Sequence, residues 1–242
     1  MTGRLLLGML TPSSNTVLEP VTTALLSEIP EASAHFGRFR VTEIALSGGA
    51  LAQFDDTEIL RAAELLSHAK VQAIGWSGTS SGWLGFQADE RLCSRIAAAV
   101  GIPACTSVLA LNEIFRLTGV KRFGLVTPYR DDVQERIVAN YAGAGFECVA
   151  ERHLGWQDNW SFSTVTADQL RAMIREVAKA GPDAITTFCT GLRAAPLVEE
   201  LEHEIGIPIY DTVATVTWKS LRLVGADARR IKGWGRLFRE VS

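Results

Sequence analysis

The sequence of 242 residues lacks the motifs by which proteins usually hold metal ions and nucleotides. Its 4 cysteines form no C-x-x-C pair and its 4 histidines form no H-E-x-x-H, so neither a disulfide framework nor a zinc site is indicated. Neither G-x-G-x-x-G nor G-x-x-x-x-G-K-[ST] occurs, which makes dinucleotides and nucleotides poor candidates as ligands. The sequence therefore predicts reduced thiols and no cofactor.

Excess charge and long apolar runs are also missing. The 24 Lys and Arg residues against 27 Asp and Glu residues give a net charge of -3, so no basic surface for nucleic acid is indicated. The longest early apolar run, Leu5–Leu10, is interrupted by Gly8 and ends at Thr11-Pro12, too short for a signal peptide or a membrane span. We expect a cytoplasmic protein that binds neither nucleic acid nor membrane.

Short apolar runs alternate with longer segments of helical periodicity. The runs have the length and composition of buried strands and are Leu5–Leu10, Val71–Trp76, Phe123–Val126 and Ala184–Phe188. Apolar residues recur at helical spacing in Gln134–Ala144 and Ala167–Ala180. This alternation predicts an α/β fold with parallel sheets flanked by helices.

Three short matches recur in the same order along the chain. They are a Thr-Pro at a strand end, a Gly-Thr or Cys-Thr loop, and a Gly-Ile-Pro before a helix. Their members lie 116, 111 and 105 residues apart, at Thr11 and Thr127, Gly78 and Cys189, and Gly101 and Gly206. The pattern predicts two Rossmann-like domains related by a pseudo-twofold axis.

We divide the chain into a first domain of residues 1–111, joined by a returning C-terminal segment of residues 212–242, and a second domain of residues 112–211. In two copies packed face to face, equivalent strand ends meet at the interface, where open α/β sheets bind their ligands. Four loops then line the candidate site: Pro12–Thr16, Gly78–Gly82, Pro128–Arg130 and Cys189–Leu192.

The loop Gly78–Gly82 follows a predicted strand and precedes a helix expected from about Gln87. Its backbone N–H groups and hydroxyls form a cradle suited to a carboxylate, although a generic Gly/Ser turn has the same composition. Cys189 has the equivalent place in the second copy, where a helix N-terminus can tune a thiol.

The remaining thiols and imidazoles carry no chemistry in this interpretation. Cys93, Cys105 and Cys148 are expected to fill the core. The histidines lie in polar segments, and none is placed as a general base; they are His35, His68, His153 and His203.

With its paired repeats and these loops, nearly the whole chain resembles the aspartate/glutamate racemase superfamily, within it the branch of arylmalonate decarboxylase and maleate cis-trans isomerase. Racemases and the isomerase of that superfamily carry one cysteine in each half. Here Gly78 stands at the first position and only Cys189 remains, as in arylmalonate decarboxylase. The resemblance also implies cofactor-independent action on a small carboxylic acid and a possible homo-oligomer.

Carried over by position, Cys189 is the proton donor of the candidate site. The residues implied to bind substrate or to stabilise an enediolate are Pro12, Ser13, Asn15, Gly78, Thr79, Ser80, Tyr129, Asn159, Thr190 and Gly191. Among them, Thr79, Ser80 and Tyr129 are the implied oxyanion donors.

A single thiol favours decarboxylation of a substituted malonate. Racemisation needs a base on one face of a carbon and an acid on the other, whereas loss of CO2 needs no base. Hydrogen-bond donors aimed at the remaining carboxylate stabilise the enediolate, and Cys189 then protonates one face. We expect Gly78→Cys to restore the second face and to confer racemising activity on a 2-substituted acid.

Two alternatives stay open. In a maleate-type isomerase or racemase of a small dicarboxylic acid, Cys189 acts as nucleophile with Tyr129 as acid, and Asn15 and Asn159 hold a second carboxylate. The other alternative is a non-catalytic carboxylate-binding protein. Four tryptophans either line an apolar pocket for a bulky substituent or pack in the core: Trp76, Trp83, Trp156 and Trp160.

Overall fold

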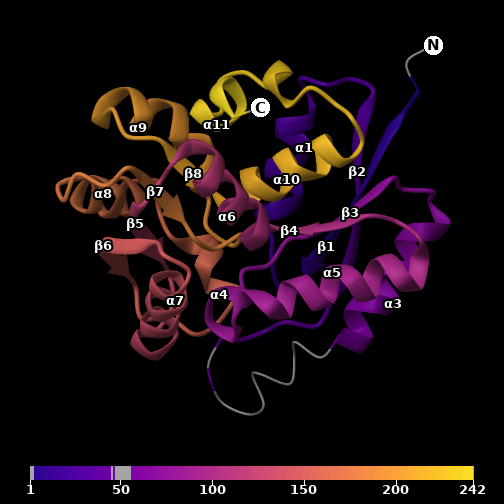
Figure 1. The fold of residues 1–242 in the computed structure, drawn as a ribbon, viewed down its shortest axis with the longest axis horizontal. Coiled ribbons are helices and arrows are strands. Elements are labelled where there is room, and N and C mark those ends of the chain that lie inside the picture. Colours follow the sequence, from indigo (N-terminus) through magenta and orange to yellow (C-terminus); the bar gives the residue numbers. More distant parts are fainter. Residues whose placement is uncertain (1–2, 45, 47–55, 242) are drawn as a thin grey trace.

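Two four-stranded parallel sheets form the framework of the computed structural model, which describes residues 3–44, 46 and 56–241 (Figure 1). The first sheet has the order β2-β1-β3-β4, from β1 (Leu5–Pro12), β2 (Ala32–Phe39), β3 (Ala73–Trp76) and β4 (Ala104–Thr106). The second has the order β6-β5-β7-β8, from β5 (Arg122–Thr127), β6 (Glu147–His153), β7 (Ala184–Thr187) and β8 (Ile209–Asp211). The predicted α/β class, with two small parallel sheets flanked by helices, is confirmed.

Strand pairing relates the two sheets residue by residue. Leu7 of β1 pairs with Ala73 of β3, and Phe123 of β5 pairs with Ala184 of β7. The equivalent positions are therefore 116 residues apart in the first strands and 111 apart in the third strands, as the sequence matches predict. The fourth strands pair in the same way, with an offset of 105.

Helices connect the strands and cover the sheets. In the first half they are α1 (Leu18–Leu26), α3 (Asp56–His68), α4 (Ser81–Leu84), α5 (Phe86–Val100) and α6 (Ser107–Thr118). After β5 they are α7 (Asp131–Gly143), α8 (Ala167–Ala178) and α9 (Val198–Ile205), and the C-terminal segment holds α10 (Thr212–Leu223) and α11 (Arg236–Glu240). Helices α5 and α9 both end at a left-handed glycine, Gly101 and Gly206, a conformation that glycine adopts without steric penalty.

The helices α6 and α10 pack against each other in the middle of the molecule, and each contacts the opposite sheet (Figure 1). In α6, Phe115 packs its ring 5.5 Å from Phe123 of β5. In α10, Val216 lies so close to β3 that a Cβ built on Gly75 would be 2.9 Å from its Cγ2 atom. The packing is the kind that a boundary near residue 111 and a return from residue 212 would produce, and this domain division stays a prediction.

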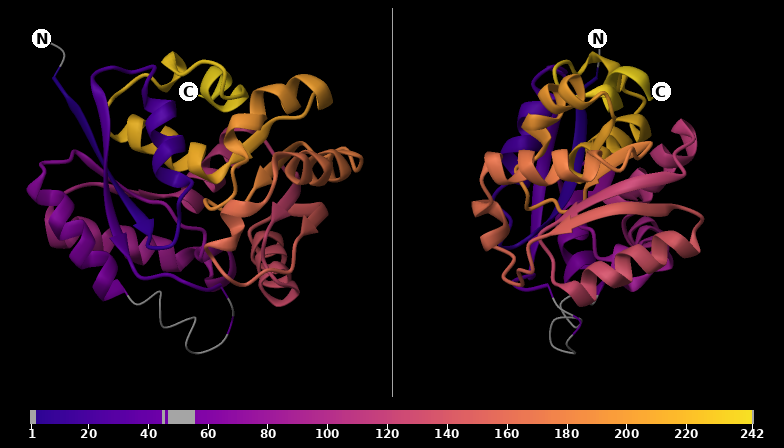
Figure 2. Two further views of the ribbon diagram at one scale, coloured as in Figure 1. Left: turned by 180° about the vertical axis from the view of Figure 1, so that it is seen from behind. Right: turned by 90° about the vertical axis from the view of Figure 1, so that its left-hand side faces the viewer.

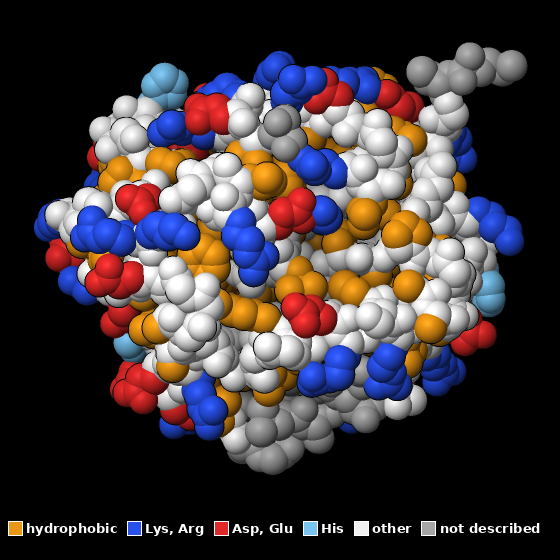
Figure 3. All heavy atoms as spheres, in the orientation of Figure 1, with side chains coloured by type: hydrophobic (Ala, Val, Ile, Leu, Met, Phe, Trp, Pro, Cys, Tyr) orange, Lys and Arg blue, Asp and Glu red, His pale blue; other side chains and the backbone are white. Residues whose placement is uncertain are grey.

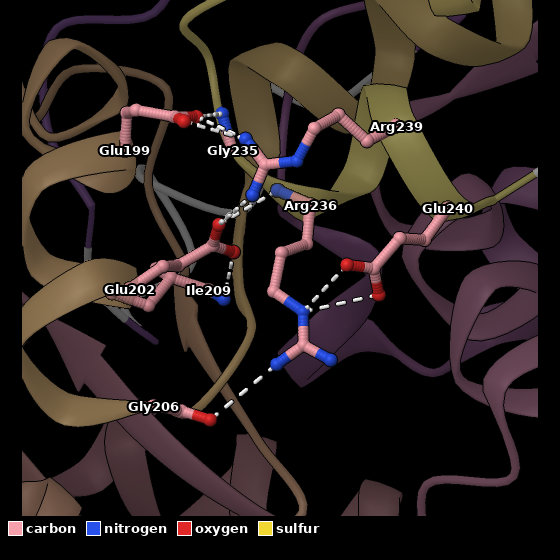
Figure 4. A network of polar contacts seen from close by, with 8 residues as sticks. All are labelled: Glu199, Glu202, Gly206, Ile209, Gly235, Arg236, Arg239 and Glu240. Carbon is pink, nitrogen blue, oxygen red and sulfur yellow. Dashed lines mark hydrogen bonds and ion pairs between the residues drawn. The ribbon is translucent and has the colours of Figure 1, made fainter.

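The C-terminal segment also contacts the second half. Glu202 of α9 accepts hydrogen bonds from the backbone N–H groups of Ile209, at 2.7 Å, and Arg236, at 2.6 Å (Figure 4). Glu199 pairs with Arg239 of α11 at 2.6 Å. The C-terminal segment, which lies along one edge of the molecule in Figure 2, also contacts the first half, where Arg230 pairs with Glu31.

Basic and acidic side chains are interspersed over the face shown in Figure 3, with hydrophobic side chains exposed between them. This mixture agrees with the small net charge of -3. In the part of the chain that the structure describes, no helix is long and apolar enough to cross a membrane.

Candidate active site

The four predicted loops meet through a continuous set of polar contacts. Asn15 Nδ2 donates to Thr190 Oγ1 at 3.1 Å, and Thr190 Oγ1 donates to the Ser77 carbonyl at 3.0 Å. The hydroxyls of Thr79 and Tyr129 lie 2.7 Å apart. Residues 175 positions apart in the chain are thereby brought into direct contact between the two halves.

Cys189 lies two residues beyond the end of β7 and is 3% exposed. Its Sγ atom accepts a hydrogen bond from the Gly191 N–H at 3.3 Å. Burial raises the pKa of the Cys189 thiol to about 11, against the lowering effect of hydrogen bonds from Tyr129 and Gly191. The thiol is therefore protonated at neutral pH.

The expected helix N-terminus at Cys189 is absent from the structure. After the thiol the chain forms a turn and a short 3-10 helix, and α9 begins only at Val198. The prediction that a helix end tunes this thiol is wrong, because the Gly-Leu-Arg segment after Thr190 does not continue into a helix. Backbone and hydroxyl hydrogen bonds take that role instead.

Tyr129 links the first-half loop to the thiol. It is 2% exposed, and its ring packs edge-on against Trp83 at 5.3 Å and Phe162 at 5.6 Å. Burial raises the pKa of Tyr129 well above its usual value, so its hydroxyl keeps its proton. When Tyr129 donates that proton to Cys189, its oxygen can accept from Thr79, which completes a chain of hydrogen bonds.

The two asparagines are engaged with the protein. Asn15 Oδ1 accepts from the backbone N–H groups of Val17 and Leu18, both at 2.9 Å, and so stabilises the start of α1. Asn159 Nδ2 donates to Ser14 Oγ at 2.7 Å. Since an amide nitrogen carries two hydrogens, each of these contacts leaves a second N–H that can face a ligand.

The remaining candidates differ in accessibility. Pro12, Ser80 and Gly191 are buried, whereas Ser13 is exposed and its Oγ accepts from the Val41 N–H at 3.1 Å. Ser80 comes directly before α4, a four-residue helix that the sequence analysis did not predict, and α5 begins at Phe86, one residue before the expected start. All of these residues lie on the four converging loops, and their roles stay predictions.

The tryptophans divide between core and surface. Trp83 is buried against Tyr129, and Trp156 packs half-buried on the core. Trp160 is 55% exposed. Trp76 is buried beside Gly78, where its ring takes up the space of a side chain.

Asp211 is a neighbour of the site that the sequence analysis missed. It is fully buried at the end of β8, where its carboxylate accepts from Thr187 Oγ1 at 2.7 Å and from the Val213 N–H at 2.8 Å. Burial raises the pKa of Asp211 to about 6, and its charge raises the pKa of Cys189. Its position between a strand and a helix, as an N-cap aspartate, is the signal that could have found it.

The other thiols and histidines lie away from these contacts. Cys105 is buried as predicted, and Cys93 and Cys148 are half-buried rather than core residues; burial raises the pKa of all three. His153 pairs with Glu151 and Asp131, each at 2.7 Å. Among residues 3–44, 46 and 56–241, no group of three or more His, Cys, Asp or Glu side chains is arranged to hold a metal ion.

A family model described as arylmalonate decarboxylase matches residues 12–238. The chain belongs to this family. It is 31% identical over 166 residues to arylmalonate decarboxylase of Bordetella bronchiseptica, an alignment of 67% of this chain and 69% of that protein. It is 30% identical to maleate isomerase of Nocardia farcinica, over 98% of this chain and 96% of that protein.

Solved structures give the same result. A variant of the Nocardia farcinica maleate cis-trans isomerase with a covalently bound succinylcysteine intermediate has a TM-score of 0.90, with 28% identity over 99% of this chain and all of that one. A liganded variant of arylmalonate decarboxylase has a TM-score of 0.85 at 23% identity, over 98% of this chain and 99% of that one, and shows the shared fold. The relatives carry two activities, a decarboxylase and an isomerase.

Proposed function

We propose that this protein is a cofactor-independent decarboxylase of a substituted malonate-type acid, with Cys189 as its single proton donor. The observation that carries the proposal is the asymmetry of two equivalent positions. Strand register places Gly78 and Cys189 at matching points beyond β3 and β7, and only the second bears a thiol.

The reaction needs little more than this arrangement. The bond between Cα and one carboxylate breaks, CO2 leaves, and the electron pair passes into the remaining carboxylate as an enediolate. Hydroxyls of Thr79 and Ser80 and the backbone N–H groups of the adjoining loops are the donors for its oxygens. Cys189 gives its proton to Cα, and solvent returns a proton to the thiolate.

The state of the thiol supports a role as an acid. Its pKa, raised to about 11, keeps it protonated between turnovers. After proton transfer, the thiolate accepts hydrogen bonds from Tyr129 and from the Gly191 N–H, which offset part of the penalty of its burial. A nucleophile would need the thiolate before the reaction begins.

Maleate-type isomerisation is the second candidate. Asn15 and Asn159 keep one N–H each for a second carboxylate, and the match to the Nocardia isomerase spans nearly the whole chain. In this reaction the Cys189 thiolate adds to the alkene, the central bond rotates, and the thiolate leaves again. The burial of Cys189 weighs against that step.

Proton NMR in D2O with phenylmalonate, methyl-phenylmalonate, maleate and aspartate separates the candidates. Loss of CO2 with one deuterium in the product supports the decarboxylase, and conversion of maleate to fumarate supports the isomerase. Binding of these acids without turnover would instead support a carboxylate-binding protein.

Substitution of the thiol tests its role. Cys189→Ser should lower kcat by about 100-fold to 10,000-fold, because a hydroxyl is a far weaker proton donor. Cys148→Ser, a half-buried thiol on β6, is the matched control and should leave kcat unchanged. Equal activity of Cys189→Ser and the wild type would refute the role of Cys189 as the acid.

A further inference from the structure

Trp76, the last residue of β3, fills the space beside Gly78. The residue is 1% exposed, and its indole packs on Phe39 with ring centroids 4.7 Å apart. A Cβ built on Gly78 would lie 2.2 Å from Trp76 Cζ2 and 2.6 Å from Cε2. Real Cβ atoms do not approach other heavy atoms so closely, so the ring excludes any side chain at residue 78.

The backbone of Gly78 gives no other reason for a glycine. Gly78 is not among the described glycines whose φ lies in the left-handed region, so other amino acids can adopt its backbone conformation. The three atoms nearest to the built Cβ all belong to the indole, which therefore keeps the position empty.

The second half shows the same position without such a ring. Trp76 pairs with Thr106 of β4 as Thr187 pairs with Asp211 of β8, so Thr187 is the counterpart of Trp76. The small Thr187 side chain turns to Asp211, with Oγ1 2.7 Å from the carboxylate. Nothing comparable to an indole then occupies the space of the Cys189 side chain.

Gly78 also lies within the cluster of loop contacts. The carbonyl of Ser77 accepts from Thr190, and the hydroxyl of Thr79 contacts Tyr129. The peptide between these two residues therefore faces the second half. The Trp76 ring fills the side-chain space of Gly78, the position that by strand register is equivalent to that of the Cys189 thiol.

We propose that Trp76 is the specificity-determining residue that closes the first-half face and confines proton transfer to the Cys189 face. The inference rests on the proposed function and deepens it. An indole has no acidic or basic group for proton exchange at carbon, so the enediolate receives its proton from one side only. Racemisation is blocked at Trp76 as well as at Gly78.

A double-mutant cycle in stability tests the steric part without any substrate. Gly78→Ala should lower Tm by about 5 °C or more in the wild-type background. In a Trp76→Leu background the same change should lower Tm by less than about 2 °C, because the smaller side chain leaves room for Cβ. Equal Tm losses in both backgrounds would overturn the inference.

Hydrogen exchange at Cα of 2-phenylpropionate in D2O tests the catalytic part. In the variant Trp76→Leu/Gly78→Cys, a thiolate on the first-half face removes the Cα proton, the electrons enter the carboxylate as an enediolate, and Cys189 protonates the other face. Exchange with racemisation should be at least about 10-fold faster than in either single variant. The matched control Trp76→Leu/Gly78→Ala opens the same space without a second thiol and should show no such gain.

The outcomes separate the inference from the function on which it rests. No gain in the double variant, in a protein whose wild type decarboxylates malonates, would overturn the role of Trp76 and leave the decarboxylase in place. A gain in Gly78→Cys alone would overturn it as well. A wild type inactive on every malonate would refute the proposed function and the catalytic part together, and the stability cycle would still decide whether the indole excludes a side chain.

Discussion

The two halves have the same strand order, but the side chains that they contribute to the candidate site differ. Their strands match in order and register, yet the residues at equivalent strand ends differ. The third and fourth strands end at Trp76 and Thr106 in one half and at Thr187 and Asp211 in the other, and two residues beyond the third strand stand Gly78 and Cys189. One side thus carries an apolar ring and a neutral helix cap, and the other a thiol and a buried carboxylate. A few side chains at equivalent strand ends are enough to make a symmetric frame chemically one-sided.

The largest difference expected outside the site concerns two equivalent glycines. A Cβ on Gly124 would lie 2.2 Å from Val177 Cγ1 of α8, whereas a Cβ on Gly8 would first meet Val71 at 3.0 Å. Gly124→Ala should therefore lower the free energy of unfolding by about 3 kcal/mol and Gly8→Ala by about 1 kcal/mol. Denaturant unfolding of both variants measures this, and equal losses would mean that the neighbours of the two glycines yield equally to an added methyl group.

A smaller effect, on the pKa of Cys189, is expected when the helix cap of the second half is replaced by the residue type that caps the equivalent helix of the first. Asp211→Thr keeps a hydroxyl cap of the kind that Thr106 provides for α6 and removes a buried negative charge. The pKa of Cys189 should fall, since the charge of Asp211 raises it. The pH dependence of Cys189 alkylation, followed by mass spectrometry, measures this pKa.

The control for that experiment is Asp227→Thr, because Asp227 caps the short 3-10 helix Ala228–Arg230 instead. Alkylation of Cys189 should keep its wild-type pH dependence in this variant. A rise in the pKa of Cys189 in Asp211→Thr would contradict the electrostatic role of Asp211.

The smallest effect is a pH dependence of stability that the first half should lack. The offset of 105 residues that relates Gly206 to Gly101 relates Glu202 to Ala97, so the first half has no titratable side chain at this position. Burial raises the pKa of Glu202 to about 7, against the hydrogen bonds from Ile209 and Arg236. Between its ordinary pKa near 4.5 and about 7, the folded state holds a proton that the unfolded state has lost, so stability falls as pH rises through this range.

Thermal unfolding at several pH values should show this slope in the wild type, and Glu202→Gln should remove its part between about pH 6 and 7, above the range in which Asp211 contributes a slope of the same sign. Glu204→Gln is the control, because pairing with Arg175 lowers the pKa of Glu204, and its titration contributes below the range in question. A slope that survives unchanged between about pH 6 and 7 in Glu202→Gln would assign the proton to another group.

Much of the frame could be predicted from the sequence. Buried strands read as short apolar runs, and Thr-Pro and Gly-Ile-Pro at strand ends gave the offsets that the strand register reproduces. Four loops were expected to meet because equivalent strand ends face each other in a duplicated fold. Polar contacts of Asn15, Thr79 and Thr190 show that they do.

The side chains that make the halves different could not be predicted. The ring of Trp76 packs on Phe39, a residue of another strand, and fills the side-chain space of Gly78, whereas the sequence alone predicts that Gly78→Cys is sufficient to open the first face. The place of Asp211 between a strand and a helix indicates a helix cap, but not that its carboxylate is buried and acts on the Cys189 thiol. Such effects arise from packing between distant segments, which spacing along the chain does not record.

Because α10 returns to the first sheet, that sheet cannot be fully covered until nearly the whole chain has been synthesised. The face of β3 around Gly75 is covered by Val216 and Ser220, which leave the ribosome long after the strand itself. Until α10 has been synthesised, the first sheet exposes the apolar face that α10 later covers. Chaperones bind nascent chains in such a state. The half that is synthesised first therefore stays incomplete until the C-terminal segment has been made.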